Sequence, residues 1–130
     1  MSLTVSPQDI ELAQAGQVDD ETFAGIIRTS LPYAFEAVQR LADRLRSGEQ
    51  VAFERPPHLE DTQRNQLLRV FASTSMREFL ERHFGIGELA FQNCHFIGGA
   101  TDAGLTSPEW QRFRSIEGQI LAQSPELVDC

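Results

Sequence analysis

The sequence predicts a predominantly helical α+β fold, with five or six helices packed on a small antiparallel two-strand unit. Apolar residues recur at helical spacing over most of the chain, and only residues 49–55 and 89–97 have strand character. The chain has 130 residues, which is an ordinary size for one domain, and it shows no repeat or low-complexity tract. Residues 1–130 are therefore expected to form a single domain.

Two helices are expected in the first thirty residues. Ser6 and Pro7 form a helix start, because the serine side chain can cap and the proline fits the first helical turn. Gly16 is typical of a helix end. A second helix is predicted to begin at Asp19 or Asp20 and to run to about residue 30.

The strongest helical pattern covers residues 31–48. Its apolar positions share one face of the helix and are Leu31, Ala34, Phe35, Val38, Leu41, Ala42 and Leu45. Pro32 lies in the first turn, so we expect a fresh helix capped by Ser30 rather than one long kinked helix. Glu36 and Arg40 stand four residues apart and are expected to form an ion pair on the exposed face.

A short strand and a pair of helices are predicted next. Residues 49–55 alternate as a strand does, with Val51 and Phe53 on one face, and two prolines end the segment. The pattern over residues 61–84 indicates two helices joined by a polar turn at 72–75. Such a pair can read DNA, but the exposed positions of its second helix carry two charges of each sign. A simple helical hairpin is therefore favoured.

The last long helix is predicted to begin after a loop of small residues. Thr106 is its expected cap, and Glu109 is placed to complete a capping box. Its expected buried face consists of Trp110, Phe113, Ile116 and Ile120. The helix is expected to end near residue 123.

Residues 89–99 stand out because they are aromatic, apolar and almost uncharged: Leu-Ala-Phe-Gln-Asn-Cys-His-Phe-Ile-Gly-Gly. A strand that is apolar on both faces requires burial on both faces. The helices of one chain cover one face easily, and a second copy would cover the remainder and remove an exposed edge. We therefore expect a homodimer with this segment at or beside the interface.

Five residues could supply a thiolate or an imidazole, namely Cys94, Cys130, His58, His83 and His95. Neighbouring strand residues face opposite sides, so Cys94 and His95 do not pair directly. A catalytic Cys94 would need His58 or His83 to be brought close by the fold. No Cys-x-x-Cys or His-x-x-x-His spacing occurs, so no metal site is expected, and no cofactor motif is present. Structural roles are favoured for these side chains.

All 11 basic residues are arginines. The absence of lysine excludes Schiff-base chemistry, a lysine general base and a P-loop lysine. The formal net charge is −8, which disfavours binding to nucleic acid or to anionic membranes. The acidic residues concentrate near the N-terminus. Such an acidic surface can meet a basic partner, although a solvated face is the more common reading.

The sequence contains neither a signal peptide nor an apolar run long enough to cross a bilayer, which predicts a cytoplasmic protein. We expect a small regulatory or adaptor protein that is not an enzyme and acts through protein association. Its expected contact surfaces are the acidic N-terminal helices and the edge at residues 89–99. The alternative is a small enzyme or ligand-binding domain. Its site would gather Cys94 or His95 with His58, His83 and an arginine such as Arg55.

Overall fold

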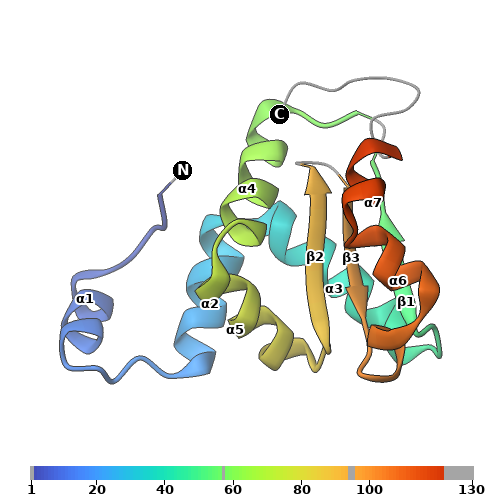
Figure 1. The fold of residues 1–130 in the computed structure, drawn as a ribbon. Helices are drawn as coiled ribbons and strands as arrows, with labels where there is room; N and C mark the ends of the chain where they lie inside the picture. Colours follow the sequence, from blue (N-terminus) through green and yellow to red (C-terminus); the bar gives the residue numbers. More distant parts are fainter. Residues whose placement is uncertain (1, 57, 94–95, 122–130) are drawn as a thin grey trace.

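A computed structural model describes residues 2–56, 58–93 and 96–121 (Figure 1). Within these ranges, three strands and seven α-helices confirm the predominantly helical α+β fold. The helices are α1 (Pro7–Gln14), α2 (Asp20–Ser30), α3 (Pro32–Arg46), α4 (Asp61–Phe71), α5 (Thr74–Phe84), α6 (Pro108–Phe113) and α7 (Ile116–Leu121), with a short 3₁₀ helix η1 (Ala103–Thr106) before α6. The strands are β1 (Val51–Glu54), β2 (Glu88–Asn93) and β3 (Phe96–Ala100).

The sheet is antiparallel, with the order β1-β3-β2. The segment expected as one strand over residues 89–97 is a hairpin, because the chain reverses between Asn93 and Phe96. The sheet therefore has three strands rather than two. Apolar patterning missed the reversal because the residues between Phe91 and Phe96 include neither glycine nor proline, and Asn93 is their only turn-favouring residue.

Both faces of the sheet are covered within the chain. On one face, Ala52, Leu89 and Ile97 join the main core with the apolar sides of α2, α3, α4 and α5. On the other face, Trp110 and Phe113 of α6 pack against β1 and β3 (Figure 1). We expected a homodimer because this segment requires burial on both faces, but the helices of the chain itself cover most of both faces. The homodimer stays a prediction.

Helix α3 begins as expected but is capped differently. Leu31 occupies the N-cap position and makes no side-chain cap. The side chain of Gln66 on α4 supplies the cap instead, because its Oε1 accepts from the backbone N–H of Tyr33 at 2.8 Å and of Ala34 at 3.2 Å. The prediction that Ser30 caps α3 is wrong. Its hydroxyl accepts from the Thr4 N–H and ties down the N-terminal segment.

Helix α1 lies apart from the rest of the structure (Figure 1). Ser6 and Asp9 form a reciprocal capping box at its start, which confirms the predicted helix start. The helix buries none of its residues. Its stability therefore depends on local caps rather than on packing.

The long C-terminal helix predicted after Thr106 is two short helices in the structure. Its cap is Ser107, whose hydroxyl accepts from the Trp110 N–H, so the predicted Thr106–Glu109 box is wrong. Helix α6 ends at Phe113, and Ser115 starts α7 by accepting from the Gly118 N–H. This break turns the second helix, so its apolar side chains do not continue the buried face of α6.

Two further features concern the surface. Arg40 does not pair with Glu36 as predicted. It forms a two-pronged ion pair with Glu54 of β1, with Nη2 at 2.5 Å from Oε1. In the described part of the chain, no helix is long and apolar enough to span a membrane.

Candidate functional site

The structure separates the two histidines that it describes. His58 is exposed in the loop before α4, and His83 is exposed near the end of α5. The His83 ring stacks on Phe79, with 5.6 Å between centroids. The start of α4 and the end of α5 lie at opposite ends of the molecule (Figure 1). The two imidazoles therefore do not share a site.

Cys94, His95 and Cys130 lie outside the described residues, so their predicted roles stay predictions. Among the described residues, no group of three or more histidine, aspartate and glutamate side chains could hold a metal ion.

Aromatic side chains gather on the outer face of the sheet. The Phe113 ring of α6 lies 4.9 Å from the Phe53 ring, 5.1 Å from Phe96 and 5.4 Å from Trp110, measured between centroids. Offset and edge contacts at these distances stabilise aromatic pairs beyond simple burial. We call Phe53, Phe96, Trp110 and Phe113 the aromatic cluster.

Three rings of this cluster pack directly on the backbone of Gly98 in β3. A Cβ atom at this position would lie 2.9 Å from a Phe53 carbon, 3.0 Å from Trp110 and 3.2 Å from Phe113. Glycine is thus required because three rings approach the backbone closely. Gly99, on the opposite face, has no comparable crowding, since its nearest side-chain atoms lie 3.5 Å away or more.

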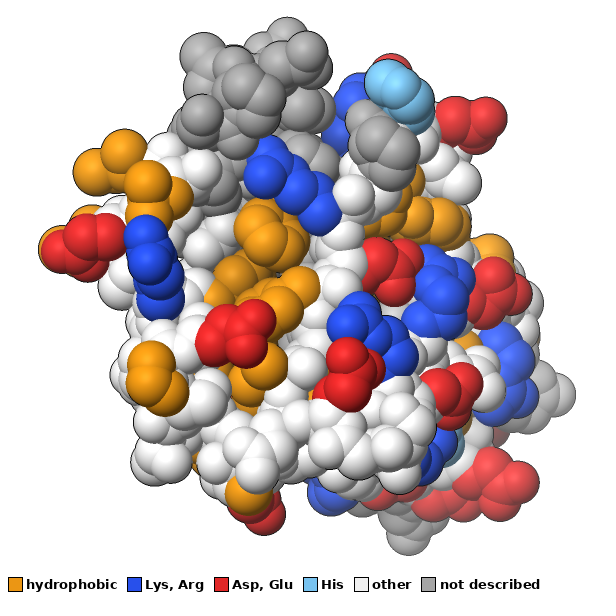
Figure 2. Space-filling view, turned by 90° about the vertical axis from the view of Figure 1, so that its right-hand side faces the viewer, with side chains coloured by type: hydrophobic (Ala, Val, Ile, Leu, Met, Phe, Trp, Pro, Cys, Tyr) orange, Lys and Arg blue, Asp and Glu red, His pale blue; other side chains and the backbone are white. Residues whose placement is uncertain are grey.

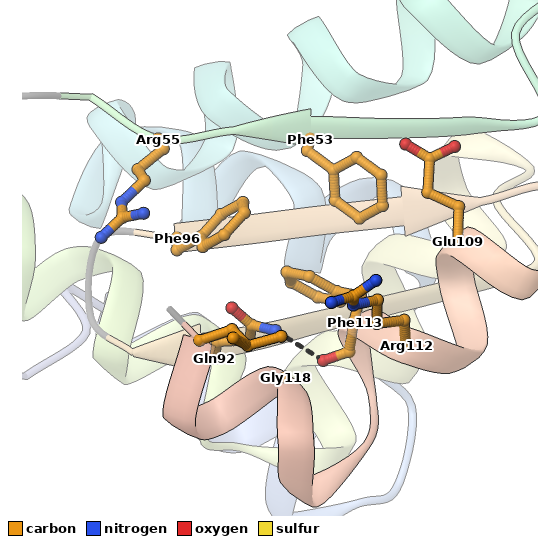
Figure 3. A pocket seen from close by; sticks show the side chains of 9 residues that line it. Phe53, Arg55, Gln92, Phe96, Glu109, Arg112, Phe113 and Gly118 are labelled. Carbon is orange, nitrogen blue, oxygen red and sulfur yellow. Dashed lines mark hydrogen bonds between the residues drawn. The ribbon is translucent and has the colours of Figure 1, made fainter. Parts of the chain in front are cut away.

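An open hollow of about 260 Å³ lies between the aromatic cluster and the C-terminal helices (Figure 3). It is lined by Phe53, Arg55, Gln92, Phe96, Glu109, Arg112, Phe113, Gly118 and Leu121. Figure 3 shows side chains from β1, β2 and β3 meeting those of α6, with Gly118 of α7 beside Gln92. Segments distant in sequence therefore build one concave, mainly apolar surface.

Gln92 lies at the lower side of the hollow and is only half satisfied. Its Nε2 donates to the carbonyl oxygen of Phe113 at 2.8 Å, which fixes the orientation of the amide. Its Oε1 is buried and has no hydrogen-bond partner. Figure 3 shows the nitrogen turned to that carbonyl and the oxygen turned the other way. Buried acceptors are normally paired, so an unpaired one marks a place where a donor is missing.

Two arginines stand at the rim of the hollow. The Arg55 guanidinium lies over the Phe96 ring, 5.2 Å from its centroid. Arg112 is exposed and forms no ion pair with any described residue. Glu109 lines the opposite end of the hollow from Arg55 (Figure 3). The rim therefore carries two guanidinium groups and one carboxylate.

Helix α7 carries exposed apolar side chains, one of which, Leu121, lines the hollow. Ile116 is 79% exposed, Ile120 72% and Leu121 50%, although the sequence placed the two isoleucines on a buried face. A Cβ at Gly118 would lie 2.3 Å from the Arg112 carbonyl oxygen of α6 and 2.8 Å from Gln92 Nε2 of β2, so the start of α7 packs closely on both. Figure 2 shows hydrophobic side chains gathered on this side of the molecule, with charged groups around them. We call Phe53, Phe96, Phe113, Ile116 and Ile120 the aromatic face.

A second hollow follows the exposed edge of β2 and is polar. Glu81 of α5 accepts from the outward N–H of Leu89 at 2.7 Å and so covers one unpaired group of the edge. Burial raises the pKa of the Glu81 carboxyl above its ordinary value, and the Leu89 hydrogen bond opposes this rise. Glu78 and Glu88 add further negative charge to the lining, beside Arg77 and Arg114.

The sequence indicated part of this site and missed the rest. Residues 89–99 were singled out as an association segment, and two of them, Gln92 and Phe96, line the hollow. Arg55 was named as a candidate and lies at the rim. Arg112 carried no sequence signal, because a lone arginine on a helix is usually a solvated side chain.

Over residues 1–130 the sequence matches the protein family KH_NucS_shadow, described as NucS shadow ORF. The chain belongs to this family. No curated protein and no solved structure matches it. The family description names a reading frame and states no activity, ligand or partner.

Proposed function

We propose that this chain is a small, non-enzymatic adaptor or regulatory protein of the cytoplasm, which binds another protein through its aromatic face. The observation that carries the proposal is the open aromatic hollow with the exposed Leu121 at its edge, on a short helix that also exposes Ile116 and Ile120. Exposed apolar side chains that lie together and are rimmed by polar groups are typical of protein-binding surfaces. Single scattered ones are not.

The composition of the face supports this reading. Protein interfaces are enriched in aromatic residues and arginine, and their strongest contacts sit in pockets surrounded by less important ones. Here Phe53, Phe96 and Phe113 line the pocket, and Arg55 and Arg112 stand at its edge. Leu121 of α7 lines the same pocket, and its helix exposes two isoleucines as well.

The letters KH in the family name suggest a nucleic-acid function as the competing reading. They denote a domain that clamps nucleotides with a Gly-x-x-Gly loop. However, the chain contains no Gly-x-x-Gly, and the turn between α4 and α5 is Ala72-Ser73. The net charge of −8 also opposes phosphate binding, so a protein partner is favoured.

The enzyme or ligand-binding alternative depends on residues 94 and 95, because the described histidines lie apart. Within the described lining of the hollow, Glu109 is the one carboxylate, and the same lining has no serine, cysteine, histidine or lysine to act as a nucleophile or a base. The lining thus favours binding over catalysis.

Self-association remains a specific prediction within this proposal. Light scattering on the purified chain tests it, and a dimer broken by Ile120→Glu would make the partner a second copy. A stable monomer at micromolar concentration would leave a different protein as the partner.

Site-specific photo-cross-linking tests the proposed function. A photoreactive residue is placed at position 116 or 120, and a matched control is placed at Leu68 of α4, which is 40% exposed. NucS is the first protein to be mixed with the chain, since it is the one protein that the family description names. The proposal expects a discrete adduct from 116 and 120, with NucS or in cells, and none from 68. Equal labelling from all three positions, or no adduct at all, would contradict it.

A further inference from the structure

We propose that the free edge of β2 binds an extended segment of a different protein, which joins the sheet as a further strand and carries one basic side chain. This surface is separate from the aromatic face, because the hollow along β2 and the aromatic hollow share no lining residue. The inference therefore goes beyond the proposed function. Three observations carry it: the unpaired strand edge, the open hollow beside it and the carboxylates of α5 that line this hollow.

The edge of β2 leaves backbone hydrogen-bonding groups without partners. Among the described strands, β2 pairs with β3 alone. Ladder hydrogen bonds alternate along an antiparallel strand, so the backbone groups of Leu89 and Phe91 point away from β3. Glu81 accepts from the Leu89 N–H, but no hydrogen bond of a described residue reaches the Leu89 carbonyl or either backbone group of Phe91. An added strand would supply the two missing donors and the missing acceptor.

The opposite edge of the sheet is covered differently. In β1, the outward carbonyl of Phe53 accepts from the Arg44 guanidinium of α3 at 2.6 Å. At the β2 edge, the Glu81 carboxylate lies 2.7 Å from the Leu89 nitrogen and occupies the place where the carbonyl of an added strand would accept. An incoming carbonyl would replace it without loss of a hydrogen bond for Leu89, and the released carboxylate would face the new strand.

The space beside the edge fits an extended chain. A hollow of about 370 Å³ follows β2, with Glu78 of α5 on one wall and Arg114 at the end of α6 on the other. Figure 1 shows β2 between these two helices. Neighbouring strands lie about 4.8 Å apart, whereas a helix is about 10 Å wide and uses its backbone groups internally. The hollow and the edge together select an extended segment.

The charges that line the hollow leave α5 with uncompensated negative charge. Glu88 of β2 is already paired with Arg114, whose Nε lies 2.8 Å from its Oε1. Glu78 and Glu81 are three residues apart on α5 and both line the hollow, and Glu78 joins no ion pair among the described residues. Arg77 beside them offsets only part of this charge. One basic side chain from the partner would balance the remainder.

The pleat of the added strand decides where this basic residue lies. Leu89 and Phe91 point to the main core, which is the side of the sheet covered by α5. Residues opposite them in an added strand point to the same side. A basic residue opposite Leu89 would therefore meet the carboxylates of α5, and an apolar residue opposite Phe91 would pack beside its half-buried ring. In an antiparallel strand the expected motif is apolar–any–basic.

A second copy of the chain does not fit this edge. Two-fold pairing of β2 with its own copy would bring the α5 carboxylates of both chains together, where a cation is required. Like charges opposite one another destabilise a strand pair, and the net charge of −8 adds to the repulsion. The same carboxylates oppose a phosphate backbone. The partner is therefore a different protein.

An NMR titration of the full, isotope-labelled chain tests the inference, because the amide signals of Leu89 and Phe91 report on the edge directly. The probe is the peptide Gly-Thr-Val-Thr-Arg-Thr-Gly. Its Val and Arg N–H groups would face β2, so N-methylation of Val should weaken binding roughly fivefold, the factor for one lost hydrogen bond. N-methylation of the Thr between them should leave binding unchanged. Replacement of the peptide Arg by Gln should weaken binding several-fold.

Matched protein variants test the charge. Glu78→Gln should weaken the Arg probe several-fold and leave the Gln version of the probe unchanged. The control, Glu11→Gln, removes the same charge from an exposed position on α1, which lies apart from β2, and should change neither. Matching circular dichroism melts confirm that both variants are folded.

Five results would overturn the inference. They are unshifted Leu89 and Phe91 amides with every peptide at millimolar concentration, equal binding of the two N-methylated probes, and equal effects of Glu78→Gln and Glu11→Gln. The fourth is a shift of these amides by single-stranded RNA but not by the peptides. The fifth is a shift that depends on protein concentration alone, which would make the occupant a second copy. The proposed function is tested separately, by the cross-links from positions 116 and 120.

Discussion

Replacement of Gly98 by alanine tests the packing that creates the aromatic cluster. Neither Gly98 nor Gly99 has a positive φ, so alanine is compatible with the backbone at both positions. The two substitutions add the same methyl group to opposite faces of one strand. At Gly98 the new carbon would meet three rings at 2.9–3.2 Å, whereas at Gly99 its nearest side-chain neighbours lie at 3.5 Å.

The expected magnitudes follow from these distances. Carbon atoms prefer about 3.5–4.0 Å, so the rings must retreat by roughly half an ångström or more. Overpacking of this kind typically costs about 1–3 kcal/mol, and loosened ring pairs add to it. We expect Gly98→Ala to lower the free energy of unfolding by about 2–3 kcal/mol, or roughly 6–12 °C in melting temperature. Gly99→Ala should be neutral or stabilising by up to about 1 kcal/mol, because it removes glycine entropy from the unfolded chain.

Urea denaturation followed by circular dichroism and tryptophan fluorescence measures both effects. The single tryptophan, Trp110, lies within the cluster and reports on it directly. Wild-type stability in Gly98→Ala would refute the packing argument. So would an equal loss in both variants, because that would point to the strand backbone rather than to the rings.

Three further predictions concern the scaffold. Gln66→Ala removes the cap of α3 and should lower the free energy of unfolding by about 1 kcal/mol in urea denaturation. Ser30→Ala should change it by less than about 0.5 kcal/mol. A larger loss in Ser30→Ala than in Gln66→Ala would show that Ser30 is the cap. Glu81→Gln keeps an acceptor for Leu89 but removes a carboxyl whose pKa is raised by burial. Between the ordinary and the raised pKa the folded protein binds more protons than the unfolded chain, so the wild type loses stability as pH rises through this window. The advantage of Glu81→Gln in urea denaturation should therefore grow as pH increases from about the ordinary value of 4.5, and a difference that is independent of pH would count against it. Glu54→Gln should lower the free energy of unfolding by less than about 1 kcal/mol at low salt, measured by thermal melts at several salt concentrations. The loss should vanish at high salt, because the ion pair with Arg40 is exposed. A larger loss that is the same at all salt concentrations would contradict this prediction.

Much of the fold could be predicted because local signals agreed with the tertiary structure. Ser6 with Pro7 and Asp19 mark helix starts that depend on neighbouring residues alone. The stripe over residues 31–48 and the alternation around Phe53 likewise match the core. These features have short sequence range, so a linear reading recovers them.

The failures have different origins, one of which involves residues distant in sequence. The cap of α3 comes from Gln66, more than thirty positions away. The hairpin between β2 and β3 lacks a turn-forming glycine or proline, so its apolar run resembles one strand. Ile116 and Ile120 continue the spacing of Trp110 and Phe113, and only the break at Ser115 turns them outwards.

The hollow itself could not be predicted from motifs. Its lining includes Gln92, whose Nε2 is hydrogen-bonded and whose Oε1 is not. It also includes Arg55, which follows β1, and Arg112 of α6. None of these residues forms a recognisable spacing with another. The sequence could indicate residues 89–99 as an association segment, but not which side of the hairpin faces a partner.

Amide hydrogen exchange on the complex with the cross-linked partner tests the central claim most directly. The claim is that the aromatic face is the surface that binds protein. The account predicts slower exchange in α6, α7 and β1 when the partner is present, with no change in α1 or α4. Protection confined to α4 and α5, or to the acidic first helix, would contradict the account and place the partner elsewhere.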